Sequence, residues 1–143
     1  MYKNILVSVD FFSETEKVIE KASAMSERMN AQVHLVHVIE DPVPMYDAYT
    51  LPSLPVIDMA EVREQLLKKL HTLADAHNIP QDHCHIEYGS VSKAIIDFSN
   101  EIKADLIIAG SHGRHGIGLM LLGSTSGSVL HHANVDFLAV RVQ

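Results

Sequence analysis

The chain alternates short apolar runs with longer segments in which apolar residues recur every three or four positions. The first run, NILVSVD at residues 4–10, is rich in β-branched side chains and is typical of a strand buried on both faces. The periodic segments indicate amphipathic helices. The pattern predicts strands within 4–10, 32–40, 83–89, 105–110 and 136–142, and helices within 13–30, 58–77, 90–104 and 124–132.

The first two predicted helices have recognisable ends. Ser13 with Glu16, and Asp58 with Glu61, form capping-box patterns at their starts. Asn30 indicates where the first helix stops.

The segment from Glu40 to Ile57 contains four prolines and predicts an extended loop. Its length is unusual for a compact domain, so the loop is expected to be either functional or mobile. Its tyrosines, Tyr46 and Tyr49, either anchor the loop or close over a bound ring.

Strands that alternate with helices predict a parallel sheet covered on both faces. We therefore expect a single α/β domain over residues 1–143, a three-layer sandwich whose five-stranded parallel sheet has the order 3-2-1-4-5. Ligands of such sheets lie beyond the carboxyl ends of the strands, where the strand order reverses. Asp10 ends the first strand and Gly110 the fourth, so both are expected at that crevice.

Composition restricts the class of protein. The chain is 47% hydrophobic and 20% charged, which allows an ordinary core, and its formal charge of −7 argues against binding nucleic acid or an anionic membrane. The single cysteine, Cys84, excludes an internal disulfide, and Asp10 interrupts the first apolar run too early for a signal peptide. No apolar run approaches ~20 residues, so we expect a cytoplasmic protein with no membrane insertion.

Residues 109–128, AGSHGRHGIGLMLLGSTSGS, form a stretch rich in glycine and serine between the fourth strand and the last helix. Gly110 and Gly113 would let the backbone approach a nucleotide with no Cβ in the way. Gly123 precedes the helix start, where unpaired N–H groups and the helix dipole favour phosphate. The alternative is a mobile loop with an ordinary serine N-cap. The side chains that can donate to phosphate oxygens here are Ser111, His112, Arg114, His115, Ser124, Thr125 and Ser126.

Several segments together resemble the universal stress protein family over essentially the whole chain. They are MYKNILVSVD at 1–10, HLVHVIE at 34–40, DLIIAGSHGR at 105–114 and LLGSTSGSVLHHANVDFLAVR at 121–141. The spacing G-x2-G-x9-G-S/T is similar to that of the ATP-binding branch. The resemblance implies an adenine nucleotide alpha hydrolase-like fold, ATP with Mg²⁺ or Mn²⁺ as ligand, and a homodimer formed through the last strand, Val135 to Val142.

The resemblance also implies where the nucleotide lies. The first strand would end beside the adenine and ribose, and the second would contact adenine through its backbone. The loop from Gly110 would wrap the ribose and phosphates, and the hydroxyls after Gly123 would hold the phosphate tail. The implied site residues are Ser8, Val9, Asp10, Val38, Gly110, Ser111, His112, Gly113, Arg114, His115, Gly116, Gly123, Ser124, Thr125 and Ser126.

Two features depart from the family pattern. Gly116 and Gly118 lie close together in the loop and imply looser, weaker binding. Gly127 lies inside the last predicted helix, where glycine is unfavourable, and suggests close backbone packing or an irregular first turn.

The ten histidines do not predict a metal site. His34 and His37 are three apart on a strand, so they point to opposite faces. His83 and His85 share a face while Cys84 takes the other, and the Cys/His spacings of zinc sites are absent. Cys84 is expected to be a packed small residue and not a nucleophile.

Three functions remain open at this point. The resemblance favours an ATP-binding, nucleotide-responsive homodimer of regulation or stress response, with an unspecified protein partner. The second is an enzyme, a slow ATPase or related nucleotide-processing enzyme. Because Asp10 is the one carboxylate placed near the phosphates, and no catalytic residue is assigned, at most weak ATP hydrolysis is expected. The third is a nucleotide-free interaction module.

Overall fold

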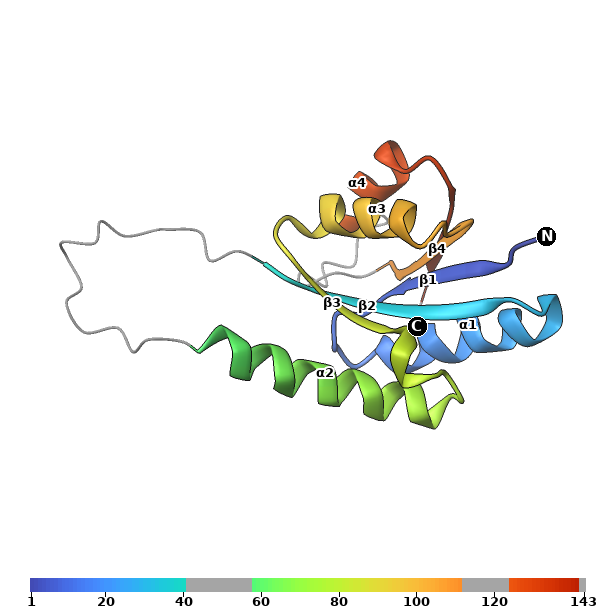
Figure 1. The fold of residues 1–143 in the computed structure, drawn as a ribbon. Coiled ribbons are helices and arrows are strands. Elements are labelled where there is room, and N and C mark those ends of the chain that lie inside the picture. Colours follow the sequence, from blue (N-terminus) through green and yellow to red (C-terminus); the bar gives the residue numbers. More distant parts are fainter. Residues whose placement is uncertain (41–57, 112–123, 142–143) are drawn as a thin grey trace.

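The computed structural model describes residues 1–40, 58–111 and 124–141 of the chain. In these ranges a five-stranded sheet lies between two layers of helices (Figure 1). The strands are β1 (Asn4–Ser8), β2 (Gln32–Ile39), β3 (Cys84–Tyr88), β4 (Leu106–Gly110) and β5 (Asp136–Val140). The helices are α1 (Thr15–Met29), α2 (Met59–Ala76), α3 (Val91–Glu101) and α4 (Ser124–His132), with a short 3₁₀ turn, η1 (Gln81–His83).

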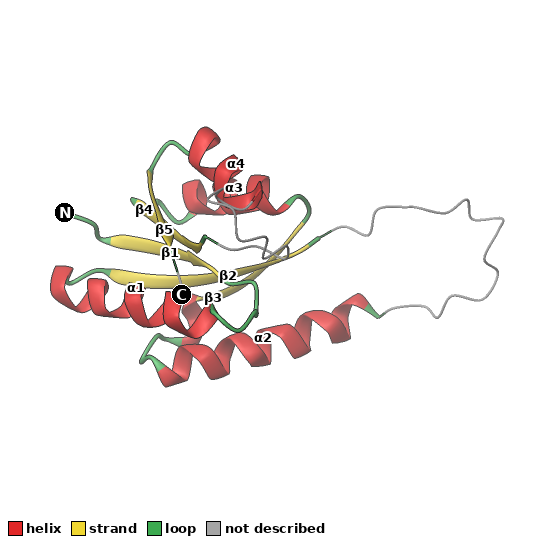
Figure 2. Cartoon of the chain, turned by 180° about the vertical axis from the view of Figure 1, so that it is seen from behind, coloured by secondary structure: helices red, strands yellow, loops and turns green. Residues whose placement is uncertain are grey.

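All five strands run parallel, in the order β3-β2-β1-β4-β5. Helices α1 and α2 cover one face of the sheet, and α3 and α4 cover the other, as the front and back views show (Figures 1 and 2). The order and the three layers confirm the expected α/β fold. Because the order reverses between β1 and β4, the loops after these two strands leave the sheet side by side.

Successive residues of one strand enter two separate cores. On β1, Ile5 and Val7 belong to the core beneath α1 and α2, whereas Leu6 belongs to the core beneath α3 and α4. All three side chains are 0% exposed. Burial on both faces explains why the run at 4–10 is apolar at consecutive positions and does not alternate.

Two of the expected helix ends are confirmed. Asn30 ends α1 in the left-handed conformation, with φ of 53°, and its N–H donates to the Ser26 carbonyl. The Asp58 carboxylate caps α2 by accepting from the N–H groups of Ala60 at 3.0 Å and Glu61 at 3.4 Å.

The expected capping of α1 by Ser13 is wrong. The helix begins at Thr15, and its N-cap residue, Glu14, makes no side-chain capping bond. Asp10 contacts the start of the helix through a side-chain oxygen, because its Oδ1 accepts from the Phe12 N–H and from the Thr15 hydroxyl, each at 3.0 Å. A carboxylate close to the first turn also suits the helix dipole.

No helix in the described ranges combines the length and the apolar character needed to cross a bilayer. The expected proline-rich loop, with Tyr46 and Tyr49, lies outside the described residues.

Candidate functional site

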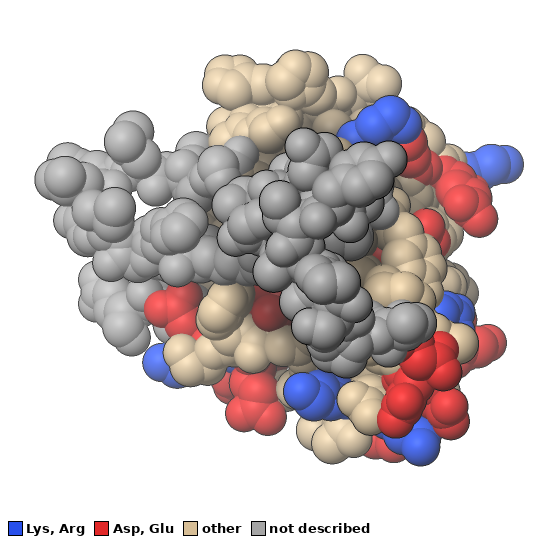
Figure 3. Space-filling view, turned by 90° about the vertical axis from the view of Figure 1, so that its left-hand side faces the viewer, with Lys and Arg blue, Asp and Glu red and all other residues tan. Residues whose placement is uncertain are grey.

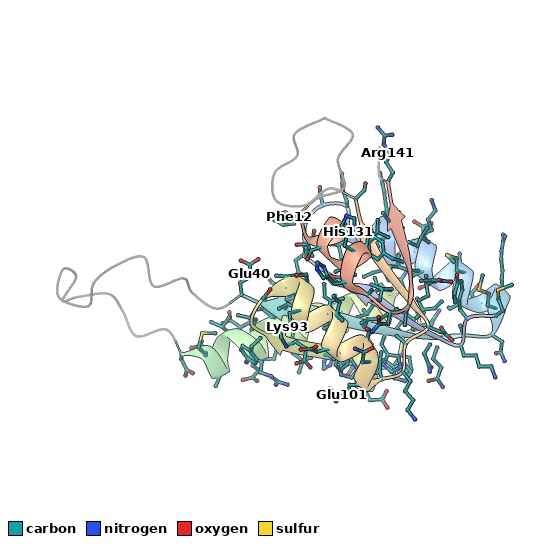
Figure 4. All side chains as sticks on the ribbon, turned by 90° about the horizontal axis from the view of Figure 1, so that it is seen from above. Phe12, Glu40, Lys93, Glu101, His131 and Arg141 are labelled. Carbon is teal, nitrogen blue, oxygen red and sulfur yellow. The ribbon has the colours of Figure 1, made fainter. Side chains whose placement is uncertain are left out.

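The carboxyl ends of β1 and β4 lie side by side. Val7 of β1 is paired with Ile108 of β4, so the residues that follow, Val9 and Gly110, are neighbours at the end of the sheet. This is the end on the left of Figure 1. Phe12, which follows β1, and Glu40, which follows β2, lie at the same end (Figure 4). The structure therefore brings Asp10 and Gly110 together, as the sequence predicted.

Asp10 sits in a tight turn between β1 and α1. The next residue, Phe11, has φ of 62°, a left-handed conformation that non-glycine residues rarely adopt. The two hydrogen bonds to Asp10 Oδ1, described above, hold this turn closed. The Asp10 carboxylate is itself exposed, so it is available at the rim of the sheet.

Val38 lies near the carboxyl end of β2, two residues beyond Val36, which is the last residue of β2 paired with β1. The final paired residues are Ser8 and Val36, and the Val9 N–H then donates to the Val36 carbonyl at 2.8 Å. Peptide groups alternate in direction along a strand, so those of Val36 and Val38 face the same side, toward β1. The N–H and C=O of Val38 thus face the space beyond the end of β1, whereas the residue is 7% exposed and its side chain belongs to the core.

The start of α4 is fastened to the end of β4. The Ser126 hydroxyl donates to the Gly110 carbonyl at 2.9 Å, and the Ser126 side chain is buried. Ser111 continues the strand by donating its N–H to the Val140 carbonyl at 2.9 Å. The first turn of α4, whose N–H groups have no partner within the helix, is therefore held beside the end of β4.

Gly110 faces α1. A Cβ on Gly110 would lie 3.6 Å from Cγ2 of Val18 in α1, which is an ordinary van der Waals contact. The close approach of a nucleotide to this glycine stays a prediction.

Several of the expected site residues cannot be placed. His112, Gly113, Arg114, His115, Gly116 and Gly123 lie outside the described residues, and so does the side chain of Ser124. Thr125 is half-buried in the first turn of α4.

The surface at this end of the molecule carries charges of both signs. Lys and Arg side chains alternate with Asp and Glu side chains across the described atoms, and uncharged residues occupy the upper part of the view (Figure 3). The described surface at this end therefore shows no single broad basic patch.

The model of the universal stress protein family matches residues 1–141. The chain belongs to this family. Universal stress protein A homolog 2 of Coxiella burnetii is 39% identical over 144 residues, which cover 99% of this chain and 97% of that protein. The resemblance drawn from the sequence is confirmed.

Two solved structures share the fold. Universal stress protein UspA from Lactobacillus plantarum is 24% identical, with a TM-score of 0.73 and 98% of each chain covered. A universal stress protein in complex with cAMP is 23% identical, with a TM-score of 0.64, covering 97% of this chain and 96% of that one. At these identities the likeness shows that family members have the same α/β architecture.

A cluster of three histidines, which the sequence pattern did not reveal, lies at the opposite end of the sheet. The rings of His34 and His83 stack with centroids 4.1 Å apart, and His34 Nδ1 lies 3.3 Å from His85 Nε2. His83 belongs to η1 and not to the third strand, where the sequence placed it. The separation of His34 from His37 is confirmed, because His37 contacts the ring of Phe11 on the other face.

Two histidines of the cluster, His34 and His85, resist protonation. Burial, followed by the charges of His83 and His85, lowers the pKa of His34 to about 4. Burial likewise lowers the pKa of His85. No group of three or more His, Cys, Asp or Glu side chains within the described part of the chain could hold a metal ion.

Gly127 lies inside α4, as expected, and a Cβ added to it would meet nothing within 4 Å among the described residues. Close backbone packing, one of the two reasons expected for this glycine, is therefore not found among these residues, and an irregular first turn stays a prediction.

Proposed function

We propose that the protein is an ATP-binding member of its family that acts as a nucleotide-responsive regulatory homodimer. The proposal is supported by one structural observation above all: the Asp10 turn, the Val38 peptide and the first turn of α4 meet at the carboxyl end of the sheet. A family member in complex with cAMP supports an adenine nucleotide as the ligand class.

The adenosine part of the ligand would lie over β1 and β2. Ser8, Val9 and Asp10 would border the ribose and the ring, with the Asp10 carboxylate accepting hydrogen bonds from ribose hydroxyls. The Val38 peptide would face the edge of the adenine ring. These contacts use mainly backbone groups, which a rigid parallel sheet positions well.

The phosphates would lie over the loop from Gly110 to Gly123 and the first turn of α4. Helix N–H groups and the hydroxyls of Ser124 and Thr125 favour anions there. The Ser126 hydroxyl donates to Gly110, so we give Ser126 the role of fixing the helix start.

Mg²⁺ or Mn²⁺ would enter together with the triphosphate. Mg²⁺ is usually bound by one or two protein oxygens plus substrate phosphates. Serine and threonine hydroxyls in the first turn of α4, with the nearby Asp10 carboxylate, fit that donor set.

Dimerisation would use the last strand, Val135 to Val142. β5 is an edge strand that pairs with β4, and an open strand edge favours pairing with a second copy. β4 links this edge to Gly110, so ordering of the glycine loop by ATP would bias the dimer. We propose a cytoplasmic location, where ATP is available and Cys84 stays reduced.

The binding test is isothermal titration calorimetry with Mg·ATP, Mg·ADP, AMP, cAMP and Mg·GTP. Asp10→Ala should weaken ATP binding at least ~10-fold, which corresponds to ~1.4 kcal/mol. Asp105→Ala is a matched control, because Asp105 accepts two backbone N–H groups, from Lys3 and Asn4, at the opposite end of β1. Both variants lose a carboxylate that orders the backbone, but only Asp10→Ala should lose affinity. Absence of ATP binding by the unsubstituted protein at millimolar nucleotide favours the nucleotide-free module.

Three further measurements complete the test. Gly113→Val should abolish ATP binding while thermal unfolding shows an intact fold, because a branched side chain would occupy the phosphate path. Turnover of ATP at ~1 per second or faster would instead identify an enzyme. Mass spectrometry of small molecules released by heating freshly purified protein identifies the nucleotide that the protein retains.

A further inference from the structure

At the end of the ladder between β1 and β2, the Val9 carbonyl bonds a side chain in place of a backbone N–H. In a regular parallel ladder, the rung after Val9 N–H to Val36 would run from the Val38 N–H to the Val9 carbonyl. Among the described residues this rung is absent. The Val9 carbonyl accepts instead from His37 Nδ1, at 2.7 Å.

The His37 ring is held in place for this bond. A carbonyl oxygen can only accept, so the hydrogen must be on Nδ1. The Phe11 ring packs against the imidazole with centroids 4.6 Å apart. Phe11 adopts its rare left-handed conformation in the same turn, so ring contact and strained backbone occur together.

This substitution of partners determines what Val38 can bind. Because the Val9 carbonyl accepts from His37, the N–H and C=O of Val38 make no hydrogen bond to β1 among the described residues and face the space beyond its end. The N–H and C=O of one residue in a strand point to the same side, so Val38 offers one donor and one acceptor side by side. The Watson–Crick edge of adenine offers the complementary pair, an acceptor at N1 and a donor at N6, whereas guanine has a donor at N1 and an acceptor at O6.

We propose that His37 is a positioning residue of the nucleotide site, which keeps the Val38 peptide open for the edge of an adenine ring by occupying the Val9 carbonyl. The identity of the ligand in this inference rests on the proposed function, whereas the hydrogen bonds of Val9 and His37 do not depend on it. His37 would thereby determine the preference of the site for adenine over guanine, although its imidazole need not touch the nucleotide.

Two substitutions separate the hydrogen bond from the ring. Asn Nδ2 is attached at the same covalent distance as His Nδ1, so His37→Asn keeps the donor and removes the ring. His37→Phe keeps a ring against Phe11 and removes the donor. Thermal unfolding of each variant monitors the fold.

The geometry is tested without any nucleotide, by amide hydrogen exchange measured by NMR. In His37→Phe the released Val9 carbonyl should pair with the Val38 N–H, so exchange at Val38 should slow ~10-fold or more, while exchange at Val36 should not slow. In His37→Asn the amide of Val38 should exchange as fast as in the unsubstituted protein. A general loss of stability would speed exchange at Val38, whereas the proposal expects slower exchange in His37→Phe. Unchanged or faster exchange at Val38 in His37→Phe would overturn the proposal.

The consequence for binding is tested by calorimetry with Mg·ATP and Mg·GTP. His37→Phe should lose ~10-fold in ATP affinity and most of its preference over GTP, whereas His37→Asn should stay within ~3-fold. If ATP binds the unsubstituted protein and His37→Phe equally well, the role of His37 is overturned but the proposed function stands. If the unsubstituted protein binds no ATP, the proposed function fails, and amide exchange alone decides the role of His37.

Discussion

The hydroxyl of Ser126 donates to the carbonyl oxygen of Gly110 at 2.9 Å, and this bond joins the first turn of α4 to the last residue of β4. Gly110 lies where the ladder with β1 runs out, so its carbonyl needs a partner from outside the sheet. The buried Ser126 side chain supplies it and fixes where α4 begins.

Ser126→Ala should lower the free energy of unfolding by ~1–2 kcal/mol, because it leaves the part-buried Gly110 carbonyl without its donor. Urea unfolding measures the loss. Ser128→Ala, on the same helix at a half-buried position, is the control and should change stability by less than ~0.5 kcal/mol. Equal effects of the two substitutions would contradict the special role of Ser126.

Gly127→Ala should stabilise the protein by ~0.5–1 kcal/mol, because alanine in a helix interior loses less backbone entropy than glycine. The added methyl group meets nothing within 4 Å among the described residues. The midpoint of thermal unfolding should therefore rise. A fall in the midpoint would show that this position is crowded in solution.

The sequence predicts the fold of this protein better than its side-chain contacts. Apolar runs such as 4–10 directly encode burial on both faces, and the loops after β1 and β4 follow from the strand order. Capping by Ser13 failed because a capping-box pattern cannot reveal that Asp10, beyond a left-handed Phe11, reaches the same helix start. The Ser126 bond to Gly110 could not be predicted either, because it joins residues 16 apart across a loop.

The histidine cluster shows the same limit. His34 and His83 come together because β2 and β3 pair in the register that sets Leu35 beside Cys84. Shifting that register by one residue would separate the two rings and leave the hydrophobic pattern on the wrong faces. The spacing of histidines along the chain therefore carries no sign of the cluster.

Cys84 should react slowly with thiol reagents in the folded protein. Burial, followed by the charges of Asp75 and Asp82, raises the pKa of its thiol to about 11. The side chain is 8% exposed, and its Sγ donates to the Leu70 carbonyl at 3.8 Å. Labelling with iodoacetamide at pH 8, followed by mass spectrometry, should be at least ~10-fold slower in native than in urea-unfolded protein. Equal rates would show that this edge of the sheet opens readily.

The stability of the fold should fall as pH drops from about 6.5 toward 4, partly through His34 and His85. Burial lowers the pKa of His34 to about 4, so the unfolded chain takes up a proton before the folded one does. The stabilisation is complete above pH 6.5 and is lost as the pH approaches the folded value. Asp82 opposes the shift at His34, and Asp82 and Glu101 oppose it at His85. Solvent screening of the half-exposed rings limits the contribution of His34 to about 1–2 kcal/mol.

His34→Asn isolates this contribution from the carboxylates that also titrate in this range. Asparagine keeps a polar group facing His85 but does not titrate, so the free energy of unfolding should depend less steeply on pH between 6.5 and 4. Urea unfolding at half-unit intervals of pH measures the slope. His131→Asn changes an exposed histidine at the end of α4, outside the cluster, and should leave the slope as it is in the unsubstituted protein. A slope in His34→Asn equal to that of His131→Asn would mean that His34 takes up its proton equally readily in the folded and unfolded chains.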